Sequence, residues 1–498
     1  MSTDLSNATL VWFLNDHRLS DHPALHAAAK KGPVLPVYVH DPAAEGDWAP
    51  GAARRWWIHQ SLNALGESLA GVGLTLYIRQ GDSETVLREL LARTGIRRLY
   101  FNQRPTPALR ARDLALARTL RGEGLDAVIH EGPLLHDPSA VTTGSGTPYT
   151  VFTPFWRKFQ AEVRPSRPLD APAFTNEHRR ADALLRTMLA TPATPDSKQP
   201  WSSDLKALEL LPSIAWDAGF YEHWVPTEAD AQRRLREFLA GPVRDYKHAR
   251  DLPAQHATTG LSPYLVSGEI SARQIWAAAA EFRAAQRAGS AEDVEGEHFQ
   301  RELAWRDFSW HVLTAYPRTP DEPLKPAWAA FPWVSDPAAL KKWQRGRTGY
   351  PLVDAGMRQL WHTGWMHNRV RMVVASFLTK DLLIPWQDGA RWFWDTLVDA
   401  DLANNSMGWQ WAAGCGADAQ PFFRIFNPTS QGQKFDPDGE YIRHWIPELR
   451  QVRGRGIHEP EVGPSLFESA TEYPAPMVVH AQARDRAMAA LASMKTTA

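Results

Sequence analysis

The chain has 498 residues, of which 44% are hydrophobic and 22% charged, and this predicts a globular protein of two or three domains. Its 55 Lys and Arg nearly balance 56 Asp and Glu, which excludes a polybasic arm and restricts any nucleic-acid surface to a local patch. The only cysteine is Cys415, which excludes an internal disulfide framework and a cysteine-rich metal site. No apolar run reaches membrane-spanning length. We therefore expect a cytoplasmic protein with no metal and no membrane partner.

The first part of the chain alternates short apolar runs with helical patterns. Strands are predicted at 9–14, 34–39, 74–78, 98–101 and 127–129, and helices at 53–69, 84–92 and 108–120. This alternation is typical of a parallel, doubly wound α/β domain with five strands. The first strand is followed by Leu14-Asn15-Asp16-His17-Arg18 instead of a Gly-x-Gly-x-x-Gly motif, so a nicotinamide-dinucleotide role has no support.

A proline-rich stretch follows this domain and breaks the regular pattern. Its prolines are Pro165, Pro168, Pro172, Pro192, Pro195 and Pro200. After Trp201 the strand signals vanish and helical patterns continue to the end. We therefore predict an α/β domain over 1–135, an interdomain connection over 136–204, and a larger, nearly all-α domain over 205–498.

The segment Thr258-Thr259-Gly260-Leu261-Ser262-Pro263 is a hydroxyl-rich turn that leads into a helical pattern. It follows closely on the segment from Tyr246 to Arg250. Such a turn offers side-chain and backbone donors to a phosphate. On its own, the pattern is more often a simple helix cap.

Glu302, Trp305 and Arg306 fall at positions i, i+3 and i+4, so they share one helical face. A carboxyl group beside an indole suits a pocket for a planar, hydrogen-bonding ligand such as a base, where a partly desolvated acid can exchange a proton. An exposed Glu-Arg pair over a core tryptophan would have the same pattern.

The segment from Trp365 to Met372 places Asn368, Arg371 and Met372 on another helical face. This face offers an amide, a fixed cation and a soft apolar contact. We interpret His367 as a structural histidine, because no second ligand stands at a metal-site spacing.

The segment from Asp399 to Trp411 sets two carboxylates, an amide and two indoles close together. If it is helical, Asp401, Asn405 and Trp409 share one face through successive i,i+4 steps. Arg371 would pair with Asp399 if the two helices meet. The chain has 22 tryptophans, and although core filling explains most of them, some could carry electrons or stack on flat ligands.

In these blocks, and in Thr348-Gly349-Tyr350-Pro351-Leu352-Val353-Asp354-Ala355 and Phe423-Arg424-Ile425-Phe426-Asn427-Pro428, the chain resembles the DNA photolyase/cryptochrome flavoproteins. The blocks occur in family order, and the resemblance covers nearly the whole length. It implies an N-terminal α/β antenna domain and a helical domain that holds FAD in a bent shape. By motif it is most similar to bacterial photolyases that act on cyclobutane pyrimidine dimers.

The resemblance also implies roles for individual residues. Those implied to bind the cofactor are Tyr246, Thr258, Thr259, Gly260, Leu261, Ser262, Arg306, Asn368, Arg371, Asp399, Asp401 and Asn405. Arg371 and Asp399 would form an ion pair over the flavin, and Asn405 would face its reactive nitrogen. Those implied to contact the lesion or the DNA are Arg250, Glu302, Trp305, Asn368, Arg369, Met372 and Trp411. Trp409, Trp386 and Trp333 take the positions of the electron relay, and Glu302 and Asn405 take part in catalysis.

The implied activity is light-driven repair of a flipped-out cyclobutane pyrimidine dimer by electron transfer from excited reduced FAD. Glu302 would stabilise the developing negative charge on the pyrimidine carbonyl. Asn405 favours repair over signalling, because an amide cannot protonate the flavin nitrogen as an Asp would. Asn368 and Met372 favour the cyclobutane dimer over the six-four photoproduct, which requires pocket histidines. A cryptochrome-type photoreceptor and a six-four photolyase remain alternatives.

The same resemblance predicts a second chromophore in the N-terminal domain. Asn102 and Arg54 are its candidate ligands, and we expect methenyltetrahydrofolate, with 8-hydroxy-5-deazaflavin as the alternative. The expected partner is single- or double-stranded DNA that carries a pyrimidine dimer. We expect the protein to be a monomer.

Overall fold

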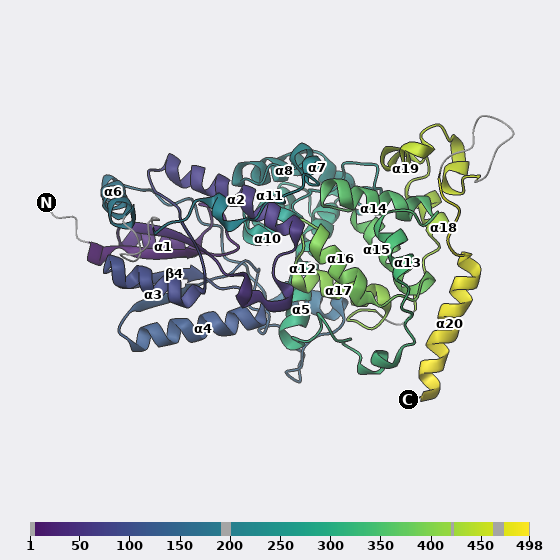
Figure 1. The fold of residues 1–498 in the computed structure, drawn as a ribbon, viewed down its shortest axis with the longest axis horizontal. Helices are drawn as coiled ribbons and strands as arrows, with labels where there is room; N and C mark the ends of the chain where they lie inside the picture. Colours follow the sequence, from purple (N-terminus) through teal and green to yellow (C-terminus); the bar gives the residue numbers. More distant parts are fainter. Residues whose placement is uncertain (1–4, 191–200, 420–422, 462–472, 498) are drawn as a thin grey trace.

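The computed structural model describes residues 5–190, 201–419, 423–461 and 473–497. The chain forms an α/β half at the N-terminal end and a larger helical half beside it, arranged along the long axis of the molecule (Figure 1). No helix in these residues is long and apolar enough to cross a bilayer.

The α/β half is built on one five-stranded sheet in which every neighbouring pair is parallel. Its strands are β1 (Thr9–Phe13), β2 (Val34–His40), β3 (Tyr77–Gln80), β4 (Arg98–Asn102) and β5 (Asp126–His130). They lie in the order β3-β2-β1-β4-β5, and Trp12 in the central strand pairs with Val37 on one side and Phe101 on the other. The prediction of a doubly wound, five-stranded parallel sheet is confirmed.

Both faces of this sheet are covered, which explains why its central strands are continuous apolar runs. The helices of this half are α1 (Pro23–Lys31), α2 (Ala52–Gly71), α3 (Ser83–Thr94) and α4 (Pro107–Gly122). Val11 and Phe13 pack against α1 and α2, whereas Leu10 and Trp12 pack against α3 and α4. One predicted strand is displaced: the third ladder runs over Tyr77–Gln80 instead of 74–78, because Leu74 is buried under α1 and α2 before the pairing with β2 begins.

The proline-rich connection is more regular than predicted. Helices α5 (Phe152–Glu162) and α6 (Asn176–Ala190) lie in the segment that we expected to be an irregular linker. α6 packs Leu185 and Leu189 on the sheet, and α5 packs against the helical half. Pro192, Pro195 and Pro200 lie outside the described residues. The domain bounds 1–135, 136–204 and 205–498 stay a prediction.

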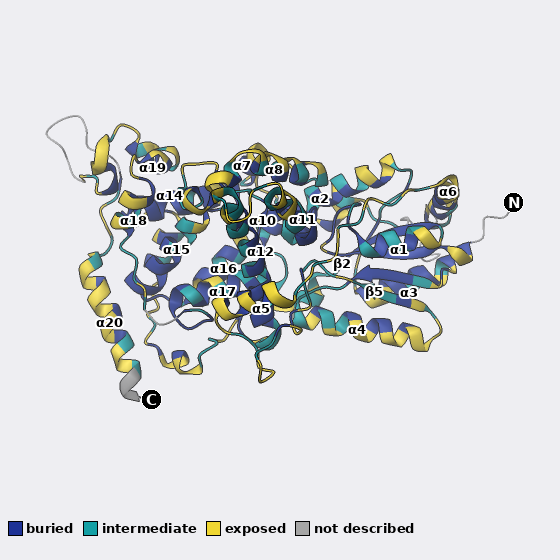
Figure 2. Cartoon of the chain, turned by 180° about the vertical axis from the view of Figure 1, so that it is seen from behind, coloured by how far each residue is buried: buried dark blue, intermediate teal, exposed yellow. Residues whose placement is uncertain are grey.

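The helical half has no strand among the described residues from 201 onward. Its helices are α7 (Ala218–His223), α8 (Glu228–Ala240), α9 (Tyr246–Ala249), α10 (Ser262–Ser267), α11 (Ala272–Ala284), α12 (Ala291–Ala315), α13 (Pro337–Gln344), α14 (Pro351–Thr363), α15 (Asn368–Ser376), α16 (Trp386–Thr396), α17 (Leu402–Ala413), α18 (Pro428–Phe435), α19 (Glu440–Trp445) and α20 (His480–Thr497). The central helices α12, α16 and α17 are largely buried, whereas α20 lies exposed along the far edge (Figure 2).

The two halves meet through main chain as well as side chains. Gly51, at the start of α2, lies against the backbone of Trp394 and Asp395, and a methyl group at this position would overlap both. Gly268 has φ +80°, and a methyl group at this position would overlap the carbonyl group of Asn15. Glycine is required at these points because no other residue lets two backbones approach so closely.

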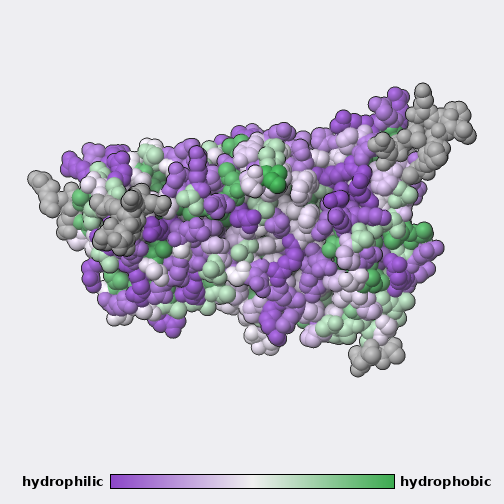
Figure 3. Space-filling view, in the orientation of Figure 1, coloured by the Kyte–Doolittle hydropathy of each residue, from purple (hydrophilic) through white to green (hydrophobic). Residues whose placement is uncertain are grey.

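The face of the molecule seen in Figure 3 is mostly hydrophilic, and its apolar residues are scattered in small groups. Single exposed apolar side chains of this kind are normal for a protein surface. The expected monomeric state stays a prediction.

Candidate functional site

Asp399 joins three segments of the helical half. Its Oδ2 atom accepts a hydrogen bond from Ser262 Oγ at 2.6 Å and lies 2.8 Å from Arg371 Nη2. Trp365 Nε1 donates to the same Ser262 hydroxyl at 3.2 Å. The helix that carries Arg371 therefore meets the segment of Asp399, and the ion pair suggested by the sequence is present.

The hydroxyl-rich turn lies directly beside this ion pair. Gly260 occupies the left-handed region, with φ +60°, and the backbone N–H of Leu261 donates to Thr259 Oγ1 at 3.2 Å. A methyl group on Gly260 would lie 3.3 Å from Arg234 Nη1. The turn therefore has a guanidinium group close to its glycine, together with the side chains of Thr258 and Thr259, which are only partly buried.

A second group of charges lies where α9 meets α12. Glu302 and Arg250 form a two-point ion pair, in which Arg250 Nη2 lies 2.8 Å from Glu302 Oε2. The guanidinium group of Arg250 also lies over the ring of Tyr246, 5.2 Å from its centroid. Burial, followed by the nearby Glu302, raises the pKa of Tyr246 above its usual range, so the phenol stays neutral. The neutral ring of Tyr246 therefore packs against the guanidinium group of Arg250.

Arg369, on α15, belongs to the same group. Its Nη2 atom lies 2.6 Å from Asp251 Oδ2, and its guanidinium group lies over the ring of Phe435. Because Arg369 and Arg371 are two residues apart on one helix, α15 connects this charge group to the Asp399 ion pair. Both ends of the predicted site are therefore held by a single short helix.

The aromatic partner of Trp305 comes from the connection. The rings of Trp305 and Phe152 are stacked, with centroids 3.6 Å apart and an angle of 9° between their planes. Phe152 covers one face of the indole, and Trp305 remains partly exposed. A planar ligand at Trp305 would therefore use the other face or the edge.

Arg306 is bound to the protein itself, and its implied cofactor role stays a prediction. Its Nη1 atom donates to the carbonyl oxygen of Pro133 at 3.3 Å and lies 3.6 Å from Asp307. Asp307 also accepts from the backbone N–H of Leu135 at 2.8 Å. The contacts of Arg306 thus bind the helix to the connection and give no support to a cofactor contact.

The first turn of α15 carries Asn368 on the surface and Met372 partly buried one turn later. His367 precedes them as the N-cap, and its Nδ1 atom accepts from the backbone N–H of Arg369 at 3.2 Å. Burial lowers the pKa of His367 to about 4. His367 is therefore a neutral, structural histidine, whereas Asn368 and Met372 remain accessible to a ligand.

On α17, Asp401 and Asn405 are held by hydrogen bonds to the protein itself. Asp401 is the N-cap, and its Oδ1 atom accepts from the backbone N–H and side-chain amide of Asn404 at 2.9 and 2.7 Å. Asn405 is buried, and its Nδ2 atom donates to the carbonyl oxygen of Ala390 at 3.0 Å. This bond ties the amide of Asn405 to α16.

The three tryptophans predicted to form an electron relay lie in one apolar cluster with α16 and α17. Trp386 and Trp409 are buried, and Trp333 is partly exposed. Gly389 lies against the ring of Trp409, so α16 and α17 are in close contact there. The backbone N–H of Val334 donates to the carbonyl oxygen of Leu383 at 2.8 Å. This bond links the segment that contains Trp333 to the segment that precedes Trp386.

The remaining predicted residues are Trp411, Asn102 and Arg54, and Trp411 packs against the cluster that contains Trp386 and Trp409. Trp411 contacts Arg424, whose guanidinium group lies 5.3 Å from the ring centroid, and residues 420–422 nearby lie outside the described residues. Asn102 is buried and bonds to Asp16 and to the backbone of Ala24. Arg54 is also buried and donates to Ser267 Oγ and to the carbonyl oxygen of Val398. Asn102 and Arg54 thus bond to the protein itself, which gives no support to direct contact with an antenna chromophore.

The sequence did not predict three residues of the site. Phe152 stacks on Trp305, Asp251 pairs with Arg369, and Arg234 lies beside Gly260. Asp251 directly follows Arg250, and this adjacent pair of opposite charges was the one available signal. Phe152 and Arg234 come from helices distant in the chain, and no spacing pattern indicates their contacts.

Comparison with known proteins agrees with this arrangement. Residues 9–173 match the family model "DNA photolyase", and residues 299–493 match "FAD binding domain of DNA photolyase". A deoxyribodipyrimidine photo-lyase of Agrobacterium fabrum is 44% identical over 98% of both chains. Cryptochrome-2 of Arabidopsis thaliana is 36% identical over 95% of this chain and 77% of its own. A crystal structure of a class III photolyase from Agrobacterium tumefaciens superposes with a TM-score of 0.88 at 42% identity, covering 100% of this chain and 99% of the other.

The fold and the site define a flavoprotein of the photolyase type, with an α/β half and a helical FAD-binding half. The chain belongs to the DNA photolyase family, and the predicted photolyase-type enzyme is confirmed.

The residues present fit an FAD cofactor. Asp399 Oδ1 is buried and has no partner within the described residues, so it offers an acceptor to a bound ligand. Thr258 and Thr259 offer hydroxyl groups beside the left-handed Gly260, as a phosphate requires. Arg371 supplies the positive charge that a reduced flavin ring attracts. The predicted cofactor residues near Asp399 therefore form a consistent donor and acceptor set.

Proposed function

We propose that this protein repairs cyclobutane pyrimidine dimers in DNA when illuminated. The observation that carries this proposal is the pair of arginines on α15: Arg371 holds Asp399 on the cofactor side, and Arg369 holds Asp251 on the side of Arg250 and Glu302. The short helix α15 thus lies between the residues that would bind the cofactor, around Asp399, and the charged residues that would bind DNA, around Arg250. Bound FAD would supply an excited one-electron donor, and the residues of the chain would position and stabilise the substrate.

The charge group would recognise a flipped-out dinucleotide. A damaged, poorly stacked pair costs less to extrude from the duplex than a normal one, so selectivity begins with this step. Arg250 and Arg369 would exchange their carboxylate partners for DNA phosphates. Glu302, released from Arg250, would take up a proton from water as the lesion enters, donate a hydrogen bond to a pyrimidine carbonyl and stabilise the negative charge that develops there. Trp305 would contact the lesion through the face or edge that Phe152 leaves open.

The lesion class follows from the groups at the first turn of α15. Asn368 and Met372 offer an amide and a thioether, which supply hydrogen bonding and apolar contact without acid-base chemistry. The six-four photoproduct would need a histidine in this place. His367 does not supply one, because its ring is buried as a helix cap and burial keeps it neutral. These features support the cyclobutane dimer.

A cryptochrome-type photoreceptor remains the second candidate, because Cryptochrome-2 of Arabidopsis thaliana is also similar to this chain. Asn405 supports repair. Its neutral amide donates a hydrogen bond to Ala390 and has no acidic proton to deliver to the flavin. Trp386, Trp409 and Trp333 would carry electrons to the flavin in both candidates and do not distinguish them.

For the antenna we propose methenyltetrahydrofolate, with 8-hydroxy-5-deazaflavin as the alternative. The proposal rests on the resemblance of the N-terminal segment to folate-type bacterial photolyases. The buried bonds of Asn102 and Arg54 indicate that other residues would contact the chromophore. The absorption spectrum of the purified protein, compared before and after chromophore extraction, distinguishes the two molecules.

One experiment tests the main proposal. The purified holoprotein is reduced and mixed with an irradiated oligothymidylate, and dimer loss is followed under blue light and in darkness. We expect loss of dimers only in the light, and binding that weakens with salt because phosphate contacts release counterions. Normal FAD content and photoreduction without any dimer loss would favour the photoreceptor. Loss of six-four photoproducts instead of dimers would overturn the lesion assignment.

A further inference from the structure

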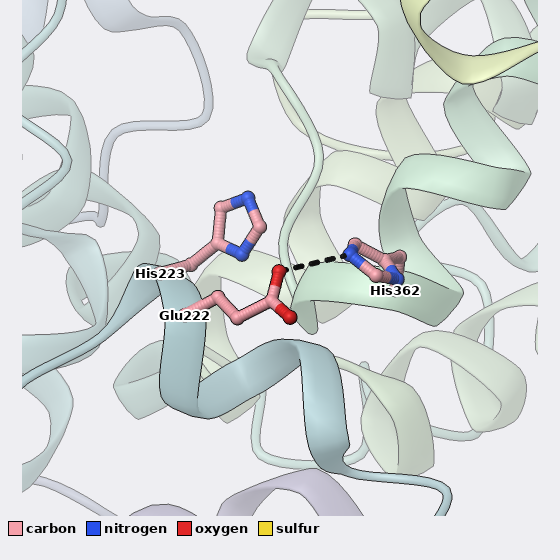
Figure 4. Close-up of side chains that lie close together, drawn as sticks. All are labelled: Glu222, His223 and His362. Atoms are coloured by element: carbon pink, nitrogen blue, oxygen red, sulfur yellow. Dashed lines mark ion pairs between the residues drawn. The ribbon is translucent and has the colours of Figure 1, made fainter.

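A group of metal-type ligands lies on the surface outside the site described above. Glu222 and His223, at the end of α7, face His362, in the last turn of α14 (Figure 4). One ligand atom from each residue lies within 4.8 Å of the other two. Within the described part of the chain, this is the one group of three His, Cys, Asp or Glu residues with such geometry.

The backbone positions of these ligands are fixed. Gly219 lies directly against the carbonyl oxygen and ring of His362, and a side chain at this position would push α7 and α14 apart. One residue beyond the ligands, Trp224 Nε1 donates to the carbonyl oxygen of Thr363 at 2.7 Å. The ends of α7 and α14 are thus in contact on both sides of the three ligands, so the backbone positions of the ligands are held close together.

The imidazole rings of His223 and His362 can act as metal ligands. His223 Nδ1 lies 2.8 Å from the carbonyl oxygen of Gly219. Because a carbonyl oxygen can only accept, Nδ1 is the donor in this bond, and Nε2, which points away from Glu222 in Figure 4, is the nitrogen that would bind an ion after the ring turns. His362 Nε2 faces Glu222 Oε2 at 3.8 Å. All three side chains are exposed, so small rotations can bring them to the distances of about 2.0–2.2 Å that zinc requires.

A third imidazole lies close by on α19. The ring of His444 contacts the Trp445 ring, and this indole also lies next to His223 and His362. Trp445 thus packs α19 against both histidine ligands.

We propose that Glu222, His223 and His362 bind a divalent ion of the zinc class, with two imidazole nitrogens and one carboxylate oxygen as ligands. Borderline nitrogen and oxygen ligands of this kind favour Zn²⁺ over Mg²⁺ or Ca²⁺. This site departs from our expectation of a protein without a metal. It requires neither DNA nor light and is independent of the proposed repair function.

The ion would act as a clamp between α7 and α14, and the clamp adjoins the cofactor turn. Trp224, directly after His223, lies beside Gly260 and under the guanidinium group of Arg234. Trp365, three residues after His362, donates to Ser262. Binding the ion only in the folded state would raise the melting temperature of the protein.

The test uses the untagged, FAD-loaded protein stripped of metal and titrated with Zn²⁺ in a calorimeter. We expect saturation at one ion per chain, affinity that falls as the pH is lowered because protons compete for the imidazoles, and a rise in melting temperature on adding Zn²⁺. His362→Ala should weaken binding at least tenfold and abolish the thermal shift. Co²⁺ absorption gives a second readout of the ligand shell.

The matched control is His248→Ala, which removes an exposed histidine that lies 3.6 Å from a carboxylate of Asp245 but belongs to no such group. It should leave both the Zn²⁺ affinity and the thermal shift unchanged. The proposal is overturned if the protein binds no Zn²⁺ saturably, or if His362→Ala and His248→Ala bind it equally well.

Discussion

Arg250 holds Glu302 in a two-point ion pair, so the carboxylate proposed to act on the lesion is neutralised by an arginine proposed to contact DNA. Replacing Glu302 with Ala should therefore leave DNA binding largely intact and lower the repair rate. A lost transition-state hydrogen bond of this kind typically costs about 10²-fold. Dimer loss per absorbed photon measures the effect.

The control is Glu297→Ala, which removes a partly exposed carboxylate from the same helix α12. It should repair dimers at the normal rate. An unchanged quantum yield in Glu302→Ala would show that the carboxylate stabilises no charge on the substrate.

Asn405→Asp should alter the absorption spectrum that develops when the bound flavin is illuminated. The acid can deliver a proton to the flavin nitrogen, whereas the amide held by Ala390 cannot. Transient or steady-state absorption during photoreduction measures the change. Identical spectra in the two proteins would contradict the placement of Asn405 beside the flavin.

Trp386→Phe should slow light-driven reduction of the flavin, because phenylalanine is much harder to oxidise than tryptophan. Trp201→Phe is a matched control, since Trp201 is also fully buried but packs in the α/β half. The rate of flavin reduction under blue light with an external donor measures both. The relay assignment fails if the two variants are reduced equally fast.

Gly389→Ala should destabilise the protein by about 1–3 kcal/mol, because the added methyl group would overlap the Trp409 ring and overpack the core. The contrasting variant is Gly408→Ala on α17, where a methyl group meets nothing within 4 Å. Alanine in an exposed helix position should instead stabilise by about 0.5–1 kcal/mol. Denaturant unfolding of the two variants should give opposite signs.

His367 should make the stability of the protein fall in mild acid. Burial lowers its pKa from 6.5 to about 4 in the folded state. Between these values the unfolded chain binds a proton that the folded chain does not, so unfolding becomes easier as the pH falls. From pH 6.5 to 5 the contribution is about 2 kcal/mol.

His367→Asn keeps a helix-capping side chain and removes the titrating group. Its free energy of unfolding, measured at pH 6.5 and pH 5, should therefore fall less than that of the unchanged protein. An equal fall in both proteins would assign the acid sensitivity to other buried groups.

Local patterns predicted much of this structure. The alternation of apolar runs and helical spacing gave the sheet, and i,i+4 spacing placed Asp401, Asn405 and Trp409 on one helix. The pairing of Arg371 with Asp399 was anticipated only on condition that two helices meet, since 28 residues separate them. The helices of the connection were missed because prolines outweighed the apolar spacing of Leu185 and Leu189.

The partners of the site residues could not be read from the sequence. Glu302 and Arg250 are 52 residues apart, and Trp305 and Phe152 lie on helices from different parts of the chain. Such contacts depend on how α5, α9 and α12 pack, which no local periodicity encodes. The bond of Arg306 to Pro133 is likewise a contact between distant segments that the sequence does not indicate.

The glycines at the junction of the two halves affect how light would be collected. At Gly51 and Gly268 the backbone of one half lies directly against the backbone of the other. Neither half can rotate relative to the other without breaking these contacts. A pigment seated in the α/β half would thus keep a constant angle to a flavin in the helical half. Because transfer of excitation depends on the mutual orientation of the two transition dipoles, its efficiency would be set by the fold and would hardly fluctuate with thermal motion.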